Sequence, residues 1–433
     1  MADILHTKHL NRFTIIWIFI FAGFASSHTH AQFVNGADIG WLSQMEATGY
    51  KFHDSTGLQK NCLQILSDKG INTVRLRVWV NPSGDKINGH CSKNEVVAMA
   101  IRAKALGMRI MIDFHYSDSW ADPGKQNKPA EWATHTFDQL LTDVYNHTFE
   151  VLDTLKRSGV IPQWIQVGNE ITMGMLWPDG STGNWPKLAQ LLNKGYDAAK
   201  ATDSSIKVVI HIDQGNDNGR FRFFFDQAAN YGVRYDIIGL SYYPYWLGTD
   251  YTVSINELAF NMNDMTARYG KPVMVVETGG DYLQVQNTYN MLAAVIERVK
   301  AVPGNQGLGV IYWEPQGEKS WSGYQLSCWN SDGIPTAALD AFKAHGTGFT
   351  GATCGAEFRF YPNPCNSGIL NFEFNSMTAG SIVRIFSIDG RLMGLYKPDG
   401  PKDAVKLNLL PGIYLVETFT GSYSIMEKLV VTN

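Results

Sequence analysis

The chain has 433 residues, of which 45% are hydrophobic, and its formal net charge is −4. This length can bury one large core and a second, smaller one. The weakly negative charge provides no basic surface for a phosphate backbone, so it excludes nucleic acid as an expected partner.

Residues 1–31 have the pattern of a secretory signal peptide. Lys8 and Arg12 precede an apolar run from Phe13 to Ala25, and small residues follow as far as Ala31. A basic segment, a short apolar segment and a small-residue cleavage region are typical of export signals. The apolar run is short for a membrane span and no later stretch is long enough, so we expect an exported protein without a membrane span.

Between residues 33 and 346, eight short apolar or β-branched runs alternate with amphipathic segments. The expected strands are 33–40, 73–79, 109–116, 164–170, 207–213, 236–243, 273–278 and 309–314. Alternating strands and helices are typical of the α/β class, and eight such units predict a (β/α)8 TIM barrel. An open doubly wound sheet is the alternative, but no GxGxxG motif follows the first strand.

Two of the expected strands run into a carboxylate. "WIQVGNE" leads to Glu170 and "VMVVET" contains Glu277. A charged side chain is rarely buried unless it is paired or functional, and the carboxyl ends of barrel strands form the active-site face. Two carboxylates at that face predict glycoside hydrolysis, in which one protonates the leaving oxygen and the other attacks or activates water.

Polar and aromatic residues also occupy the ends of the other expected strands. The candidates for substrate binding there are Asp38, Arg77, His115, His211, Asp213, Tyr243 and Trp313. Each one alone is better explained as a buried polar group with protein partners, but their common position at the strand ends predicts a functional face. Asp118 and Trp120, in the loop after the third strand, are expected to line a subsite, with loop packing as the alternative.

Ordered motifs in this region carry a family resemblance. "GADIGWL", "VRLRVWVNP", "QVGNEIT", "DIIGLSYYPYW", "VVETG" and "YWEP" occur in sequence between residues 33 and 346. Together they resemble the arabinogalactan endo-β-1,4-galactanases of glycoside hydrolase family 53. The resemblance implies a secreted, retaining endo-β-1,4-galactanase that acts on β-1,4-galactan, the type I arabinogalactan side chains of pectin.

The resemblance also implies roles for single residues. Glu170 is expected to be the acid/base and Glu277 the nucleophile, and Asn169 is expected to hydrogen-bond the 2-hydroxyl of the bound sugar. Arg77 is expected to hold Glu277 ionised, with Arg75 as the rival candidate. Tyr243 is expected to donate to Glu277, and Trp313 is expected to form the floor under the sugar.

Two alternatives to this function remain open. A mannanase, xylanase or cellulase of the same clan would use the same two glutamates, and a non-catalytic glycan-binding protein could retain the barrel. No cofactor is expected. Some members of the family bind calcium after the seventh strand, but "GGDYLQVQNTYN" lacks a dense set of oxygen ligands, so we expect no required metal, although calcium is not excluded.

The five cysteines fit an oxidising compartment without fixing a disulfide. Cys62 with Cys91, or Cys354 with Cys365, are the two candidate pairs, and Cys328 completes the set. No spacing typical of zinc sites occurs, so no catalytic or metal-binding role is expected of these residues.

After residue 346 the texture of the sequence changes. Residues 347–356 form a small-residue linker, and 357–433 contain alternating strands separated by Gly-containing turns, which predict a small all-β, sandwich-like domain. This segment resembles the C-terminal sorting domain of type IX secretion. The resemblance implies that the secretion machinery is a partner and that the protein crosses the periplasm to the cell surface or medium. An accessory carbohydrate-binding module is the alternative, but no row of aromatic residues supports it.

Overall fold

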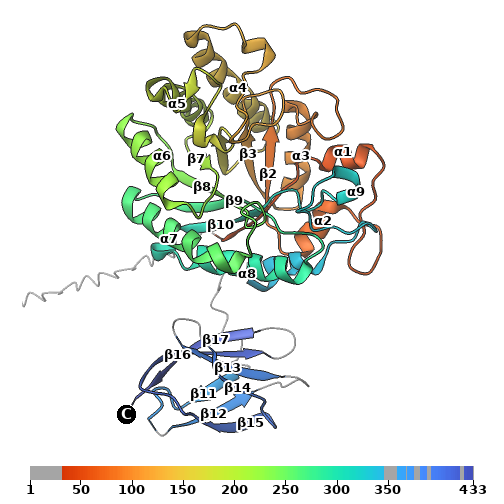
Figure 1. Cartoon of the computed structure of the whole chain (residues 1–433). Helices are drawn as coiled ribbons and strands as arrows, with labels where there is room; N and C mark the ends of the chain where they lie inside the picture. Colours follow the sequence, from red (N-terminus) through yellow and green to blue (C-terminus); the bar gives the residue numbers. More distant parts are fainter. Residues whose placement is uncertain are drawn as a thin grey trace, which may run out of the picture. The chain divides into compact units, whose positions relative to one another are not determined.

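The computed structural model describes residues 32–345, 358–366, 368–374, 381–387, 392–419 and 424–432. The expected signal peptide, the linker and Cys354 lie outside these residues. Eight parallel strands close into a barrel in the order β1-β10-β9-β8-β7-β4-β3-β2, which confirms the predicted TIM barrel (Figure 1). The barrel strands are β1 Val34–Asp38, β2 Thr73–Val78, β3 Arg109–Phe114, β4 Trp164–Val167, β7 Lys207–Ile212, β8 Ile237–Tyr242, β9 Val273–Thr278 and β10 Gly307–Tyr312.

Helices surround the barrel (Figure 1). Their starts follow ordinary capping chemistry: Ser92 and Glu95 form a capping box at the start of α3, and Thr136 and Gln139 form one at the start of α4. None of the helices in the described part of the chain is long and apolar enough to cross a membrane. The helices are α1 Leu42–Ala47, α2 Cys62–Asp68, α3 Lys93–Ala105, α4 Phe137–Arg157, α5 Trp185–Thr202, α6 Asn218–Asn230, α7 Tyr251–Tyr269, α8 Val285–Lys300, α9 Lys319–Ser322 and α10 Asp340–His345.

The side chains of the barrel strands that do not pack against the helices change character along the strands. Near the amino ends they form an apolar cluster that includes Val34, Met111, Trp164, Val209 and Ile237. Two residues further along the same strands, at alternate positions that share a face, Asp113, Gln166 and His211 follow Met111, Trp164 and Val209. The apolar layer closes one end of the barrel, and a buried polar layer lies toward the carboxyl ends of the strands.

The cysteines of the barrel are reduced. Cys62, Cys91 and Cys328 are buried thiols, and Cys91 donates to the carbonyl of Gly40 at 3.4 Å. The candidate disulfide between Cys62 and Cys91 was therefore wrong. Cys365 is also a buried free thiol, whereas its candidate partner Cys354 lies outside the described residues.

The C-terminal region forms two antiparallel sheets, which confirms the predicted all-β region. One sheet has the order β11-β12-β15 and the other β14-β13-β16-β17. Their core contains Phe360, Phe372, Val383, Val416 and Leu429. The strands are β11 Phe358–Tyr361, β12 Ile369–Phe374, β13 Ile382–Ser387, β14 Leu392–Tyr396, β15 Lys402–Lys406, β16 Gly412–Phe419 and β17 Ser424–Val431.

Candidate active site

Backbone turns at the carboxyl ends of four barrel strands adopt the left-handed conformation. Tyr116, Glu170, Gln214 and Glu314 have φ values of 50°, 45°, 53° and 47°, and each lies two or three residues beyond its strand. This conformation costs a residue with a Cβ roughly 1–2 kcal/mol. Strained backbone conformations of this kind cluster at functional sites. Two of the four side chains are carboxylates, which is consistent with a functional site at this end of the barrel.

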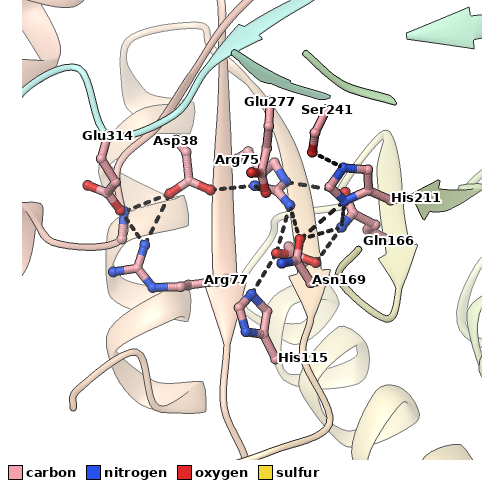
Figure 2. Close-up of polar contacts among 12 residues, drawn as sticks. Asp38, Arg75, Arg77, His115, Gln166, Asn169, His211, Ser241, Glu277 and Glu314 are labelled. Carbon is pink, nitrogen blue, oxygen red and sulfur yellow. Dashed lines mark hydrogen bonds and ion pairs between the residues drawn. The ribbon is translucent and has the colours of Figure 1, made fainter. Parts of the chain in front are cut away.

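Arg75 is the centre of the buried polar layer (Figure 2). It is fully buried, and its guanidinium forms ion pairs with Asp38 at 2.9 Å, Asp113 at 2.8 Å and Glu277 at 2.9 Å. Burial alone would lower the pKa of Arg75, but the carboxylates of Asp113, Glu277 and Asp38 raise it above its ordinary value. One permanent cation therefore faces three carboxylates, and the negative charges are in excess.

The pKa of Glu277 depends on both the Arg75 cation and this excess of negative charge. Burial raises the pKa of Glu277 to about 7, Arg75 opposes that rise, and Asp113 and Asp38 add to it. The Tyr243 hydroxyl donates to the Glu277 carboxylate at 3.1 Å, so the expected contact between these residues is present. Glu277 is thus a carboxylate fixed at both oxygens, by Arg75 at Oε1 and by Tyr243 at Oε2.

Glu170 has a different electrical environment. Its side chain accepts a hydrogen bond from the Ser241 hydroxyl at 2.6 Å and has no ion pair with any described residue. Burial and the nearby charge of Glu277 raise the pKa of Glu170 well above its usual value, and the Ser241 hydroxyl opposes this only in part. When one proton is shared between the two carboxyl groups, it therefore stays on Glu170, and Glu277 is the ionised partner.

Arg77 does not contact Glu277, so the predicted pairing of these residues was wrong. Arg77 forms ion pairs with Glu314 and, at 3.3 Å, with Asp38, whereas the rival Arg75 holds Glu277. The depth of the residues explains the exchange. Glu277 lies within β9 and meets Arg75, the deeper arginine, while Glu314 lies two residues beyond β10 and meets Arg77, the shallower one.

Glu314 is a third carboxylate at a strand end, and it was missed from the sequence. It is fully buried, and it accepts hydrogen bonds from the backbone of Trp41 and from Gln316 as well as the Arg77 guanidinium. Burial raises the pKa of Glu314 to about 8, with Arg77 opposing and Asp38 adding. The signal was present, because "GVIYWE" runs from an apolar strand into a carboxylate as the other two segments do.

Tryptophan rings surround the Arg77 guanidinium. The Cζ atom of Arg77 lies 4.5 Å from the centre of the Trp120 ring, and the Trp120 and Trp313 rings are 5.8 Å apart. Trp313 also packs edge-on against Trp41 at 5.1 Å and Tyr324 at 4.8 Å. Trp120 and Trp313 are partly exposed, so they can present ring faces to a bound sugar, whereas Trp41 is buried behind them.

Three residues predicted to bind substrate are instead buried inside the polar layer. Asp38 and His211 are fully buried and His115 is 4% exposed. Asp38 bridges the two arginines, and His115 contacts Asp113 at 2.9 Å while its other ring nitrogen accepts from Trp79 at 3.1 Å. Because the polar atoms of these three already have protein partners, a supporting role is favoured, and direct substrate contact by them stays a prediction.

Asp213 and Asp118 also have protein partners. Asp213 forms an ion pair with Arg220 at 2.6 Å, and Asp118 accepts hydrogen bonds from the backbone of Asn81 at 2.9 Å and Ala130 at 2.8 Å. Asp118 therefore ties two loops together, as the packing alternative anticipates. Substrate contact by these two aspartates stays a prediction.

Asn169 precedes Glu170 and is held on both sides of its amide. Its Oδ1 accepts from Arg75 at 2.8 Å and Gln166 at 3.1 Å, and its Nδ2 donates to the carbonyl of Ala121 at 2.8 Å. An amide nitrogen carries two hydrogens, so the orientation fixed by these contacts leaves one more donor on Nδ2. This geometry is compatible with the predicted contact to a sugar hydroxyl.

No group of three or more His, Cys, Asp or Glu side chains arranged to hold a metal ion occurs among the residues that the structure describes. In the loop after β9, Asp281 accepts from Leu283 and Gln325 of the protein itself, at 2.9 Å and 2.8 Å. The expectation of no required metal stays a prediction.

Comparisons with known proteins agree with this architecture. Residues 34–345 match glycosyl hydrolase family 53, and residues 359–432 match the secretion system C-terminal sorting domain. The chain is 35% identical over 324 residues to the probable arabinogalactan endo-beta-1,4-galactanase A of Aspergillus terreus, covering 69% of this chain and 90% of the relative. It is 35% identical over 309 residues to the endo-beta-1,4-galactanase of Bacillus subtilis, covering 65% and 70% of the two chains. The solved Ignisphaera aggregans GH53 catalytic domain superposes with a TM-score of 0.68 at 29% identity, covering 73% of this chain and 97% of that one.

Proposed function

Because the chain belongs to glycosyl hydrolase family 53, we propose that it is a secreted endo-β-1,4-galactanase that cleaves β-1,4-galactan, the side chain of pectin, with retention of configuration. The observation that carries the mechanism is the contrast between two strand-end carboxyl groups. Glu277 is paired with Arg75, whereas Glu170 accepts only a neutral hydroxyl and keeps its proton.

These surroundings support a double displacement. The ionised Glu277 attacks the anomeric carbon while Glu170 gives its proton to the departing glycosidic oxygen, and a galactosyl ester of Glu277 forms. Glu170, now ionised, takes a proton from water. The resulting hydroxide attacks the anomeric carbon, the ester bond breaks, and Glu277 regains its carboxylate.

The neighbouring residues fit the handling of a sugar ring. Trp313 and Trp120 are partly exposed aromatic rings that pack on each other and on the Arg77 guanidinium, and such rings stack on the apolar faces of sugars. The remaining Nδ2 hydrogen of Asn169 suits the 2-hydroxyl, a contact that strengthens in the transition state. Substrate identity rests on the relatives named for galactan, because another glycanase of the clan would use the same pair of glutamates.

Export is the second part of the proposal. The chain carries a secretion system C-terminal sorting domain at residues 359–432. Together with the export signal expected at residues 1–31, this domain supports passage through the periplasm and type IX delivery to the cell surface or medium.

The test of the proposed function is a panel of polysaccharides. The release of reducing sugar is measured on β-1,4-galactan, mannan, xylan and cellulose with the full-length protein and with Glu170→Gln. We expect galactan to be preferred and the variant to lose about 10²–10⁴-fold in rate while it still binds glycan. Preference for mannan or xylan overturns the substrate. If the unmodified protein binds galactan without hydrolysing it, the assignment as an enzyme is overturned.

A further inference from the structure

A chain of hydrogen bonds leads from His211 through Ser241 to Glu170. The His211 Nε2 atom lies 2.7 Å from the Ser241 Oγ, and that Oγ lies 2.6 Å from the Glu170 Oε1. Figure 2 shows the first of these contacts at one side of the polar layer. His211 and Ser241 are 0% and 1% exposed, so water does not compete for the bond between them, whereas Glu170 is partly exposed. Within the described part of the chain, Ser241 makes the one hydrogen bond to the Glu170 side chain.

The neighbours of the other ring nitrogen fix the direction of this chain. His211 Nδ1 lies 2.9 Å from the Gln166 Nε2 and 3.3 Å from the backbone nitrogen of Glu170, both of which carry hydrogens. The Gln166 amide cannot be reversed, because its Oε1 accepts from Arg75 at 3.3 Å and its Nε2 donates to Asp113 at 2.8 Å. The Glu170 backbone N–H donates to His211 Nδ1, so this nitrogen is an acceptor, although the Asn169 Oδ1 also lies 3.2 Å from it.

It follows that the single ring hydrogen of neutral His211 is on Nε2 and points at Ser241. Burial lowers the pKa of His211 well below its usual value, and the charge of Arg75 adds to the effect, so the ring stays neutral. The Ser241 oxygen accepts this hydrogen, which leaves the hydroxyl hydrogen of Ser241 to be donated to Glu170.

We infer that Ser241, oriented by His211, is a positioning residue that keeps the acidic proton of Glu170 on Oε2, the oxygen available to the leaving group. The inference rests on the proposed function of Glu170 as the acid/base. Oε1 accepts a hydrogen from Ser241, and the carbonyl oxygen of a carboxylic acid is a better acceptor than its hydroxyl oxygen, so this contact favours the acidic proton on Oε2. After the proton is given up, the same hydroxyl holds the carboxylate in place for the attack of water.

A neutral donor suits both stages of the reaction. The charged groups that face Glu170 are Glu277 on β9, Asp213 after β7 and Arg75 on β2. A cation in place of Ser241 would ionise Glu170 before the reaction, as Arg75 favours ionisation of Glu277. An uncharged hydroxyl orients the carboxyl group and disturbs its protonation less.

The test compares two substrates in the full-length protein and in Ser241→Ala. β-1,4-Galactan has a leaving group that needs a proton, whereas an aryl β-galactoside with a strongly acidic phenol does not. We expect kcat/KM to fall at least about tenfold on galactan and to change less than about twofold on the aryl glycoside. The alkaline limb of the galactan profile should move to higher pH, because the lost hydrogen bond favoured the ionised form of Glu170.

Two further variants separate positioning from a loss of structure. Ser241→Thr keeps the hydroxyl and should recover most of the galactan rate. Ser254→Ala removes another buried serine hydroxyl, on α7, which lies 2.9 Å from the Tyr242 hydroxyl. This variant should leave the rates on both substrates unchanged. An equal fall on both substrates in Ser241→Ala, or no recovery by threonine, would overturn the inference.

The outcomes also distinguish this inference from the proposed function. If Glu170→Gln leaves hydrolysis intact, the acid/base assignment fails and the inference fails with it. If Glu170→Gln abolishes galactan hydrolysis but Ser241→Ala changes neither rate nor pH profile, only the inference fails. Nitrogen NMR of histidine-labelled protein gives a check independent of activity: His211 should be neutral with its hydrogen on Nε2, and a hydrogen on Nδ1 would overturn the inferred direction.

Discussion

The barrel and the C-terminal sandwich bury different chemistry. In the barrel, Arg75 and Glu277 form an ion pair in which the arginine is fully buried. In the sandwich, Glu373 pairs with Arg359 and Lys402, whose side chains are 66% and 74% exposed. The sandwich thus forms a packed core, and in these two ion pairs the cations stay exposed although Glu373 is 8% exposed. The described ion pairs of the sandwich thus do without a buried cation, and an ion pair with both partners buried, as in the barrel, is typical of a functional site.

The largest expected effect comes from removing the barrel carboxylate that is to attack the sugar. Glu277→Gly should reduce hydrolysis by about four orders of magnitude or more, because no covalent intermediate can form. With an activated β-galactoside and azide, the anion should enter the vacated space and give the α-galactosyl azide. Glu170→Ala should still form the glycosyl-enzyme from the same substrate, and azide should then give the β-galactosyl azide. The anomers are assigned by NMR.

The same experiment can reverse the roles. Opposite anomers from the two variants would exchange the acid/base and the nucleophile. Product of inverted configuration from the unmodified enzyme would exclude the double displacement itself. A retaining enzyme also requires the two carboxyl groups to lie about 5 to 5.5 Å apart, because a larger gap admits the water of an inverting reaction.

The second prediction compares equivalent arginine substitutions in the two regions. Arg75→Gln leaves the buried carboxylates of Asp113 and Glu277 without their arginine and should lower the free energy of unfolding of the barrel by about 3–5 kcal/mol. Arg359→Gln in the sandwich should cost less than about 1 kcal/mol, because Arg359 is exposed and Glu373 keeps its ion pair with Lys402. All described tryptophans lie in the barrel, so tryptophan fluorescence during denaturant unfolding reports the barrel, and circular dichroism reports the sandwich as well. Equal effects would contradict the distinction between the two regions.

The sequence predicted the barrel well because local patterns carry its information. All eight strands were expected close to where they occur, and two apolar runs ending in Glu170 and Glu277 indicated the site. Strand periodicity could not choose between Arg75 and Arg77, because residues two apart on a strand share one face. That choice depends on how deep each partner lies in the barrel, which is a property of eight strands together.

Polar residues at strand ends could not be divided by sequence into those that meet substrate and those that support others. In the sequence, His115 and His211 cannot be told apart from residues that contact substrate. In the structure, both ring nitrogens of each histidine have a protein partner. The sequence did not predict a role for Ser241 in "GLSYY", because a single serine on a strand has no distinctive pattern. The role that we infer for Ser241 rests on its position between His211 and Glu170, which are 41 residues apart in the chain.

The third prediction concerns the pH dependence of stability. The pKa of Glu277 is raised from 4.5 to about 7 and that of Glu314 from 4.5 to about 8. Between pH 4.5 and about 8, the folded barrel therefore binds more protons than the unfolded chain. The free energy of unfolding should therefore fall as pH rises from about 4.5 to about 8. Glu314→Gln, which resembles the protonated form, should reduce this fall, as measured by denaturant unfolding at pH 5.5 and 8.5.

The sandwich supplies the control for this prediction. Hydrogen bonds from Lys402 and Arg359 lower the pKa of Glu373, so its favourable contribution is lost only as pH falls below the ordinary carboxyl range. Glu373→Gln should leave the difference between pH 5.5 and 8.5 unchanged. An unchanged pH dependence in Glu314→Gln would show that Arg77 stabilises the ionised form enough to cancel the effect of burial.

The smallest effect is expected from removing the sandwich altogether. Its core is built from residues of its own strands, and the ion pairs of Arg75 and Arg77 are completed by residues of the barrel. Deletion of residues 357–433 should therefore change kcat/KM on galactan by less than about twofold and leave the tryptophan-monitored melting of the barrel nearly unchanged, as expected for a domain with a separate core. Export in the native host should be lost, because the deleted segment contains the sorting domain at residues 359–432. A truncated protein that aggregates or loses most of its activity would show that the barrel depends on the sandwich for its fold, and the sandwich would then be more than an address.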